Sequence, residues 1–424
     1  MADADLQQLL DTLWRMESPR LIARLARMLG ELDSAEELAQ DALVAALEHW
    51  PRQGIPDNPA AWLMATAQRR AIDRLRQRRL HAQRQAQVID EQQDYAMGVD
   101  PSEQLDDIGD DLLRLVFVAC HPELPADARV ALTLRLLCGL STHEIARAYL
   151  LPEPTIAQRI VRAKRLLAER RVPFEVPRRQ ALPMRLQAVL EVIYLVFNEG
   201  YAASAGEDWT RPALCEEALR LGRVLSGLMP TAVPVMGLLA LMELQASRLR
   251  ARVGADGAAI LLLDQDRTRW DWLQIARGQA LLEQAQALGG GADPYVLQAA
   301  IAACHARARR AELTDWSAIA ALYERLAQAL PSPVVELNRV VAIAQAQGAE
   351  AAWALLQQLL DAPQLQGYVP LHAVRGDLLA RLGRHEEAAV AFSQAAALSS
   401  NARERESLLA RAAAVPSAQR LLGD

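Results

Sequence analysis

Residues 155–165, TIAQRIVRAKR, have the side-chain types and the spacing of a helix surface that reads DNA. At about 100° per residue, apolar side chains fall on one face of such a helix, and glutamine and arginine side chains fall opposite. Arginine and lysine neutralise phosphates, and glutamine or arginine can hydrogen-bond to base edges. A surface helix with a solvated basic face is the alternative. The residues expected to contact DNA are Thr155, Gln158, Arg159, Arg162, Lys164 and Arg165.

A helix-turn-helix is expected to position these side chains. Ser141 and Thr142 suit a helix start, because a side-chain oxygen can accept one of the free amide hydrogens of the first turn. A short helix then runs through Tyr149. The prolines of LPEP (151–154) break it, because proline lacks a backbone donor and disfavours helical backbone in the preceding residue. A second helix restarting near Thr155 completes the arrangement that places a helix in the major groove.

Further helices are expected towards the N-terminus. Residues 5–29 predict two helices separated near Ser18-Pro19. The sequence SAEE (34–37) matches a capping box, which predicts a helix over 35–50 that Pro51 ends.

A second basic surface follows. Asn58-Pro59 predicts a helix start, and this helix carries a dense series of arginines from residue 69 to residue 84. Such a series can follow a phosphate backbone, although solvated arginine-rich helix ends also occur. Residues 90–111 are acidic and contain glycine and proline, which predicts a linker with little structure before helices resume at about Leu112.

The composition favours an all-α protein made of modular helical domains. Apolar residues make up 52% of the 424 residues, aromatic residues only 4%, and alanine and leucine are abundant. A chain of this length predicts two to four domains. The net charge of −6 does not exclude nucleic acid, because the basic residues are clustered.

Several functional classes are not expected. The N-terminus has no basic n-region and no apolar run approaches the roughly 18 residues of a membrane span, which predicts a soluble, cytoplasmic protein without membrane contact. The four cysteines form no CxxC pair, so neither a metal site nor another cofactor is expected.

Catalysis is also not expected. The acidic residues of the C-terminal half have no nucleophile-base spacing and no phosphate-binding glycine loop, and caps and turns are the commoner role of such residues. Trp209, Trp270 and Trp272 are expected in the core. The carboxylates considered for a catalytic pair are Glu191, Glu199, Asp208, Asp264, Asp266 and Asp271.

Three segments in order, 35–50, 58–79 and 126–167, resemble a bacterial sigma factor of the extracytoplasmic-function type within the sigma-70 family. The resemblance implies binding to core RNA polymerase and to promoter DNA, with region 2 docking on polymerase and opening the −10 element and region 4 reading the −35 element. It implies polymerase contacts at Glu37, Gln40 and Asp41. It implies −10 contacts at Trp62, Arg69, Arg70, Asp73, Arg74 and Arg76.

The chain departs from the family pattern at three places, and at the first of them Leu43 stands where the family usually has phenylalanine. Arg69 stands where the family usually has asparagine, which puts a base contact at that position in doubt. The loop 52–57, RQGIPD, lies where family members capture a flipped base, yet it lacks an aromatic residue.

The C-terminal half needs its own account. FNEGY (197–201) and LLLDQDRTRWD (261–271) resemble a sigma-factor subgroup with a helical extension. Residues 372–398, with a weaker copy at 334–360, resemble a tetratricopeptide repeat whose small and aromatic positions let two helices cross closely. A plain helical bundle is the alternative. Stacked repeats would offer a concave face to a protein partner or ligand. The positions in 372–398 are Gly376, Gly383, Ala388, Phe392 and Ala395.

The sequence therefore predicts a sigma factor with an extension that modulates its activity. A helix-turn-helix regulator with a repeat scaffold and no polymerase docking is the first alternative, and a repeat scaffold without DNA binding is the second. The expected domains are region 2 (1–86), the acidic linker (87–111), region 4 (112–172), a helical extension (173–314) and tetratricopeptide-like repeats (315–424).

Overall fold

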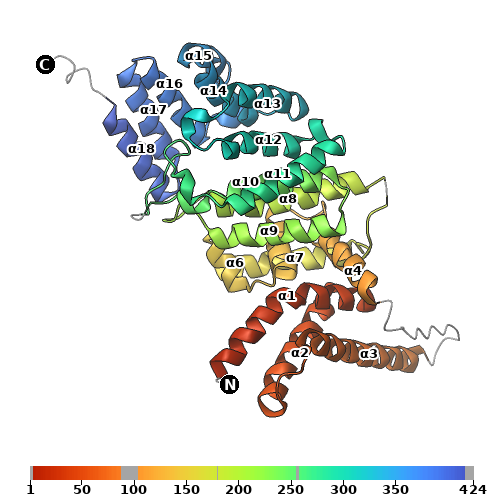
Figure 1. Ribbon diagram of the computed structural model, residues 1–424. Coiled ribbons are helices and arrows are strands. Elements are labelled where there is room, and N and C mark those ends of the chain that lie inside the picture. Colours follow the sequence, from red (N-terminus) through yellow and green to blue (C-terminus); the bar gives the residue numbers. More distant parts are fainter. Residues whose placement is uncertain (1–2, 87–103, 179, 255–256, 416–424) are drawn as a thin grey trace. The chain divides into compact units, whose positions relative to one another are not determined.

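The computed structural model describes residues 3–86, 104–178, 180–254 and 257–415 (Figure 1). These residues form helices and no strand beyond two isolated bridges, so the all-α prediction is confirmed. The chain divides into two compact units, 1–193 and 194–424, which are described separately.

The first unit contains two groups of helices. Helix α1 packs against α2, α3 and α4, and α5 packs against both α6 and α7. Fully buried side chains of α1, α3 and α5, such as Leu25, Leu63 and Leu132, fill the core. The helices are α1 (Asp3–Leu29), α2 (Leu32–Gln53), α3 (Pro59–Ala86), α4 (Gln104–Ala119), α5 (Ala126–Leu137), α6 (Thr142–Tyr149), α7 (Glu153–Glu169) and the first part of α8 (Leu182–Tyr201).

The N-terminal helix is continuous, so the predicted break near Ser18-Pro19 is wrong. Pro19 lies inside α1. An internal proline costs about 3 kcal/mol through its missing hydrogen bond and its ring clash. The following turns bury Leu21 and Ile22 almost completely, and this apolar burial offsets the cost.

The boundaries of the second helix also differ from the prediction. Helix α2 begins at Leu32, so Ser34 lies buried inside it and donates a hydrogen bond to Glu31 (2.6 Å) instead of capping it. Pro51 lies within the helix, which ends before Gly54. The predicted start of the third helix is confirmed, because Asn58 accepts a hydrogen bond from the Ala61 amide (3.0 Å).

The acidic linker is only in part as predicted. Residues 87–103 lie outside the described part of the chain, but residues 104–111 belong to helix α4. Asp111 has a side chain that is 1% exposed and accepts hydrogen bonds from Arg24 (3.4 Å), Arg27 (3.3 Å) and Arg114. The acidic composition indicated solvation, whereas three arginines neutralise this carboxylate in the interior.

The second unit consists of helices that follow one another in space as well as in sequence (Figure 1). Helix α10 is buried along most of its length by α9, α11 and α12. The helices are α9 (Pro212–Leu228), α10 (Val233–Ala246), η2 (Leu249–Ala251), η3 (Arg267–Arg269), α11 (Trp272–Ala287), η4 (Gly290–Ala292), α12 (Pro294–Arg307), η5 (Ala311–Leu313), α13 (Trp316–Ala329), α14 (Pro333–Ala346), α15 (Ala349–Gln357), η6 (Pro363–Leu365), α16 (Val369–Arg381), α17 (His385–Leu398) and α18 (Ala402–Ala414).

Helices α16 and α17 form the close pair expected over 372–398. A Cβ atom at Gly376 would lie 2.7 Å from the ring of Phe392, so the crossing requires glycine at this position. Ala388 and Ala395 are fully buried, and Gly383 turns the chain with a φ of 74°. The assignment of this pair to the tetratricopeptide repeats stays a prediction.

Replacing Gly376 with alanine should destabilise the second unit by about 1–3 kcal/mol, because the added methyl group displaces the Phe392 ring in a closely packed core. The urea midpoint of the full-length protein, followed by circular dichroism, measures this loss. Gly227 of α9 is the matched control, because a Cβ atom added there would meet no other atom within 4 Å and alanine favours a helix. Equal midpoints for the two variants would contradict the prediction.

Candidate nucleic-acid interface

The predicted helix-turn-helix is confirmed as α6 and α7. Ser141 accepts a hydrogen bond from the Glu144 amide (3.1 Å), and the Ser141 amide donates to the Glu144 carboxylate (2.8 Å), which makes a reciprocal capping box. Burial raises the pKa of Glu144, but the hydrogen bonds from Ser141 and the charge of Arg15 outweigh it, so the pKa lies below its usual range. Leu150, with a φ of 52°, turns the chain between the helices.

Helix α7 has the two faces that the sequence predicts. Ile156, Ile160, Ala163 and Leu167 are its buried residues. The exposed or half-buried side includes all six predicted DNA contacts, Thr155, Gln158, Arg159, Arg162, Lys164 and Arg165.

Two of the predicted DNA contacts make ion pairs that a phosphate can replace. Arg159 pairs with Asp127 (2.9 Å) and Arg165 with Glu169 (2.6 Å). Exposed pairs of this kind contribute about 0–1 kcal/mol, so exchanging a carboxylate for a DNA phosphate costs little. Gln158 and Arg162 are exposed on the same face.

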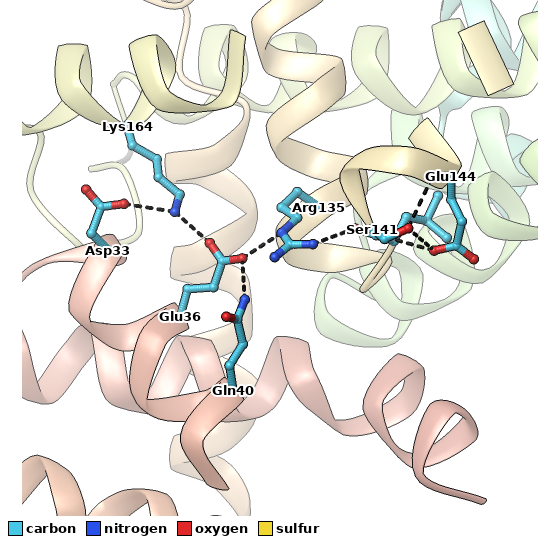
Figure 2. Close-up of polar contacts among 8 residues, drawn as sticks. Asp33, Glu36, Gln40, Arg135, Ser141, Glu144 and Lys164 are labelled. Atoms are coloured by element: carbon cyan, nitrogen blue, oxygen red, sulfur yellow. Dashed lines mark hydrogen bonds and ion pairs between the residues drawn. The ribbon is translucent and has the colours of Figure 1, made fainter. Parts of the chain in front are cut away.

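The side chain of Lys164 points at two carboxylates of helix α2, those of Asp33 and Glu36 (Figure 2). Its side chain is 12% exposed, and its ammonium group lies 2.6 Å from a Glu36 oxygen and 2.8 Å from an Asp33 oxygen. Burial would lower the pKa of Lys164, but these two carboxylates outweigh it and raise the pKa above its usual value. In this arrangement the lysine is held by protein carboxylates, and its contact with DNA stays a prediction.

Glu36 is the centre of a polar network between α2, α5 and α7 (Figure 2). Besides Lys164, it accepts hydrogen bonds from Arg135 (2.6 Å) and from Gln40 (3.1 Å). Arg135 also donates to the Leu140 carbonyl, next to the start of the helix-turn-helix. Gln40, a predicted polymerase contact, therefore donates inward to Glu36.

The remaining predicted polymerase contacts pair with predicted −10 contacts. Glu37 of α2 lies 2.7 Å from Arg74 of α3, and Asp41 lies 3.2 Å from Arg70. The two predicted surfaces therefore share two ion pairs between α2 and α3.

The other predicted −10 residues lie on the same helix. Trp62 packs edge to face on Trp50 with ring centroids 5.6 Å apart. Asp73 and Arg76 form an exposed pair (3.5 Å), and Arg69 is exposed.

Glu36 and Arg135 were missed by reasoning from the sequence. A detectable signal was present for Glu36, because it lies three residues before Ala39 and four after Leu32, on the apolar face of its helix. A charged residue at such a position indicates a buried partner. The partner itself, 99 residues away, gave no local signal.

The carboxylates that were considered for catalysis act mainly as caps or ion-pair partners. Asp266 and Asp271 accept backbone hydrogen bonds at the starts of η3 and α11, and Glu199 pairs with Arg211. Trp270 is buried as expected, whereas Trp209 and Trp272 are only half-buried.

The described ranges contain neither a cluster of metal ligands nor a membrane-spanning helix. No group of three or more His, Cys, Asp or Glu residues within them could hold a metal ion. No helix in this part of the chain is long and apolar enough to cross a membrane.

Comparison with known proteins finds three matching families along the chain. Residues 13–81 match Sigma-70 region 2, and residues 114–167 match Sigma-70, region 4. Residues 185–286 match a family of unknown function, DUF6596. The chain is also 45% identical over 389 residues to the uncharacterized protein R00370 of Rhizobium meliloti (strain 1021), covering 91% of each chain.

Proposed function

Since this chain belongs to the sigma-70 family of RNA polymerase sigma factors, we propose that it is a factor of the extracytoplasmic-function type whose helical extension modulates its activity. Members of this family bind core RNA polymerase and promoter DNA and are not enzymes. The observation that carries the proposal is the order of a region 2 match and a region 4 match, the second containing the capped helix-turn-helix.

Within this proposal, the polymerase contacts are Glu37, Gln40 and Asp41. The exposed side of α7 reads the −35 element, and the arginine side of α3 acts on the −10 element. Melting a duplex requires unstacked bases and a held single strand, which a basic surface beside aromatic side chains supports without a catalytic group. Trp62, about two turns before Arg69 and Arg70 on the same helix, would supply the aromatic part of such a surface.

Binding both promoter elements requires the first unit to open. Elements centred about 25 base pairs apart are separated by about 85 Å along DNA at 3.4 Å per base pair. Lys164, proposed for the −35 element, contacts Glu36 of α2 at 2.6 Å. Helix α2 also holds Arg70, proposed for the −10 element, through Asp41. These direct contacts cannot span 85 Å, so the contact between α2 and α7 has to break on the promoter.

Replacing Asp41 with alanine should weaken binding of the full-length protein to core RNA polymerase by about tenfold, the effect of losing a contact of about 1.4 kcal/mol. Co-elution on a sizing column over a concentration series measures this. Glu48→Ala, at an exposed position on the same helix, should bind like the wild type. Arg70→Ala removes the ion pair of Asp41 but keeps the Asp41 carboxylate. This variant should therefore retain polymerase binding.

The alternative, a helix-turn-helix regulator without polymerase docking, predicts the opposite result. Its full-length chain would not co-elute with core polymerase, and Asp41→Ala would leave its function unchanged. A chain ending at Arg171, just before the extension begins, tests the extension. Unchanged promoter-dependent transcription by this shortened chain would contradict a modulating role.

A further inference from the structure

The two stretches of the extension without an assigned role, FNEGY (197–201) and LLLDQDRTRWD (261–271), supply two aromatic rings around one arginine. Tyr201 ends helix α8, and Trp270 follows η3. The guanidinium carbon of Arg248, between α10 and η2, lies 5.8 Å from the Tyr201 ring centroid and 5.9 Å from that of Trp270.

Two further arginines lie on the same rings. The guanidinium carbon of Arg252 lies 3.7 Å from the Tyr201 ring centroid, and that of Arg267 lies 4.7 Å from the Trp270 ring centroid. Arg248, Arg252 and Arg267 are called the arginine cluster. Arg248 is 8% exposed and Arg267 is 5% exposed, so at least two of its charges are removed from water.

No carboxylate within the described ranges forms an ion pair with any member of the arginine cluster. Arg267 donates only to uncharged acceptors, namely the carbonyls of His305 (2.8 Å) and Ala308 (2.6 Å) and the Thr314 hydroxyl (3.3 Å). Burial is the largest cause that lowers the pKa of both Arg252 and Arg267, and the charge of Arg248 adds to it, whereas Tyr201 partly opposes the shift of Arg252. Glu312 acts in the opposite direction on Arg267, but it forms no ion pair with it, so repulsion among the three positive charges is compensated only in part.

Unused hydrogen-bond groups accompany these charges. The Nε atoms of all three arginines, the indole nitrogen of Trp270 and Nδ1 of His305 are buried without a hydrogen-bond partner among the described residues. Burial, with Arg248 and Arg267 nearby, lowers the pKa of His305 to about 3, so the ring is neutral at pH 7. The positive charge near neutral pH therefore belongs to the guanidinium groups.

A structural role alone does not account for this arrangement. Contacts with aromatic faces stabilise a guanidinium, but they offset only part of the cost of removing its charge from water. A buried charge ordinarily has an ionic partner, and a buried donor ordinarily has an acceptor. Both requirements would be met by one anion with several oxygens, because guanidinium groups bind carboxylate and phosphate oxygens through paired hydrogen bonds.

We propose that the arginine cluster is a binding site for a small anion that carries a phosphate or a carboxylate group. Arg248 is the central ligand, with Arg252 and Arg267 on either side of it and the rings of Tyr201 and Trp270 as the walls. The cluster belongs to the second unit, which contains none of the residues proposed to contact polymerase or promoter DNA, so its ligand would act on the extension.

Calorimetric titration of the full-length protein with inorganic phosphate, and separately with malonate, tests the site in chloride buffer of constant ionic strength. We expect binding of one anion per chain, and the tighter of the two anions identifies the phosphate or the carboxylate class. Arg248→Met should weaken this binding by about tenfold or more, the effect of losing a charged hydrogen-bond donor. Arg277→Met, at an exposed position on α11, should bind like the wild type.

Stability provides a second readout. In chloride buffer, Arg248→Met should unfold at the same temperature as the wild type or higher, because it removes an uncompensated buried charge. If this variant fails to fold, the half-buried Arg252 is replaced with methionine instead, and the same loss of affinity is expected. Absence of binding by the wild type, or wild-type affinity in a folded Arg248 or Arg252 variant, would overturn the proposal.

Discussion

Replacing Asp111 with alanine should lower the free energy of unfolding of the first unit by about 3–5 kcal/mol, the cost of removing one partner from a buried ion pair. The Asp111 side chain is 1% exposed and lies within 3.4 Å of Arg24 and 3.3 Å of Arg27, both on α1. The Arg24 side chain is itself buried. Without the carboxylate, its charge would remain in the interior without its present partner.

Hydrogen exchange of the backbone amides in α1 and α4, recorded at increasing urea concentration in the full-length protein, measures this loss. Asp73→Ala is the control, because it removes an aspartate whose ion pair with Arg76 is exposed. Such a pair contributes about 0–1 kcal/mol, so the control should unfold almost like the wild type. Similar urea midpoints for the Asp111 and Asp73 variants would show that the buried ion pairs of Asp111 do not hold α4 on α1.

The features that could be predicted from the sequence depend on neighbouring residues. The cap at Ser141, the start of α3 at Asn58 and the apolar face of α7 each follow from residues within about three helical turns of one another. Each was predicted, because capping and helical periodicity act locally.

The features that could not be predicted depend on distant partners. Asp111 was assigned to a solvated linker because nothing near it in sequence shows that α1 offers Arg24 and Arg27. Pro19 was expected to end a helix, because the burial that keeps α1 intact comes from tertiary packing. Lys164 was predicted to face DNA by helical position alone, although Glu36, 128 residues away, binds it.

These distant contacts share one consequence for the proposed function. Asp111 joins α4 to α1, and Glu36 joins α2 to α5 and α7. Both hold the helix-turn-helix side of the first unit against the side proposed to bind the −10 element. Opening on a promoter therefore requires these buried pairs to be exchanged for contacts with polymerase and DNA.

Replacing Glu36 with alanine should raise the rate at which an amine-acylating reagent modifies Lys164 by on the order of a hundredfold. Losing a buried ionic partner costs about 3 kcal/mol, which corresponds to an increase of about a hundredfold in the population of the open arrangement, in which α7 has separated from α2. Asp33 remains beside Lys164 in this variant, but its side chain is exposed and holds the ammonium group weakly. The chain contains a single lysine, so peptide mapping by mass spectrometry separates its modification from that of the N-terminal amine.

Glu37→Ala is the matched control for this measurement. Glu37 is adjacent in sequence, but it is exposed and pairs with Arg74 of α3. Its loss should leave the acylation rate of Lys164 unchanged, because the contact between α2 and α7 does not depend on it. Equal rates in the Glu36 and Glu37 variants would mean that Glu36 does not hold Lys164, and opening of the first unit would then have to be limited by other contacts, such as those of Asp111.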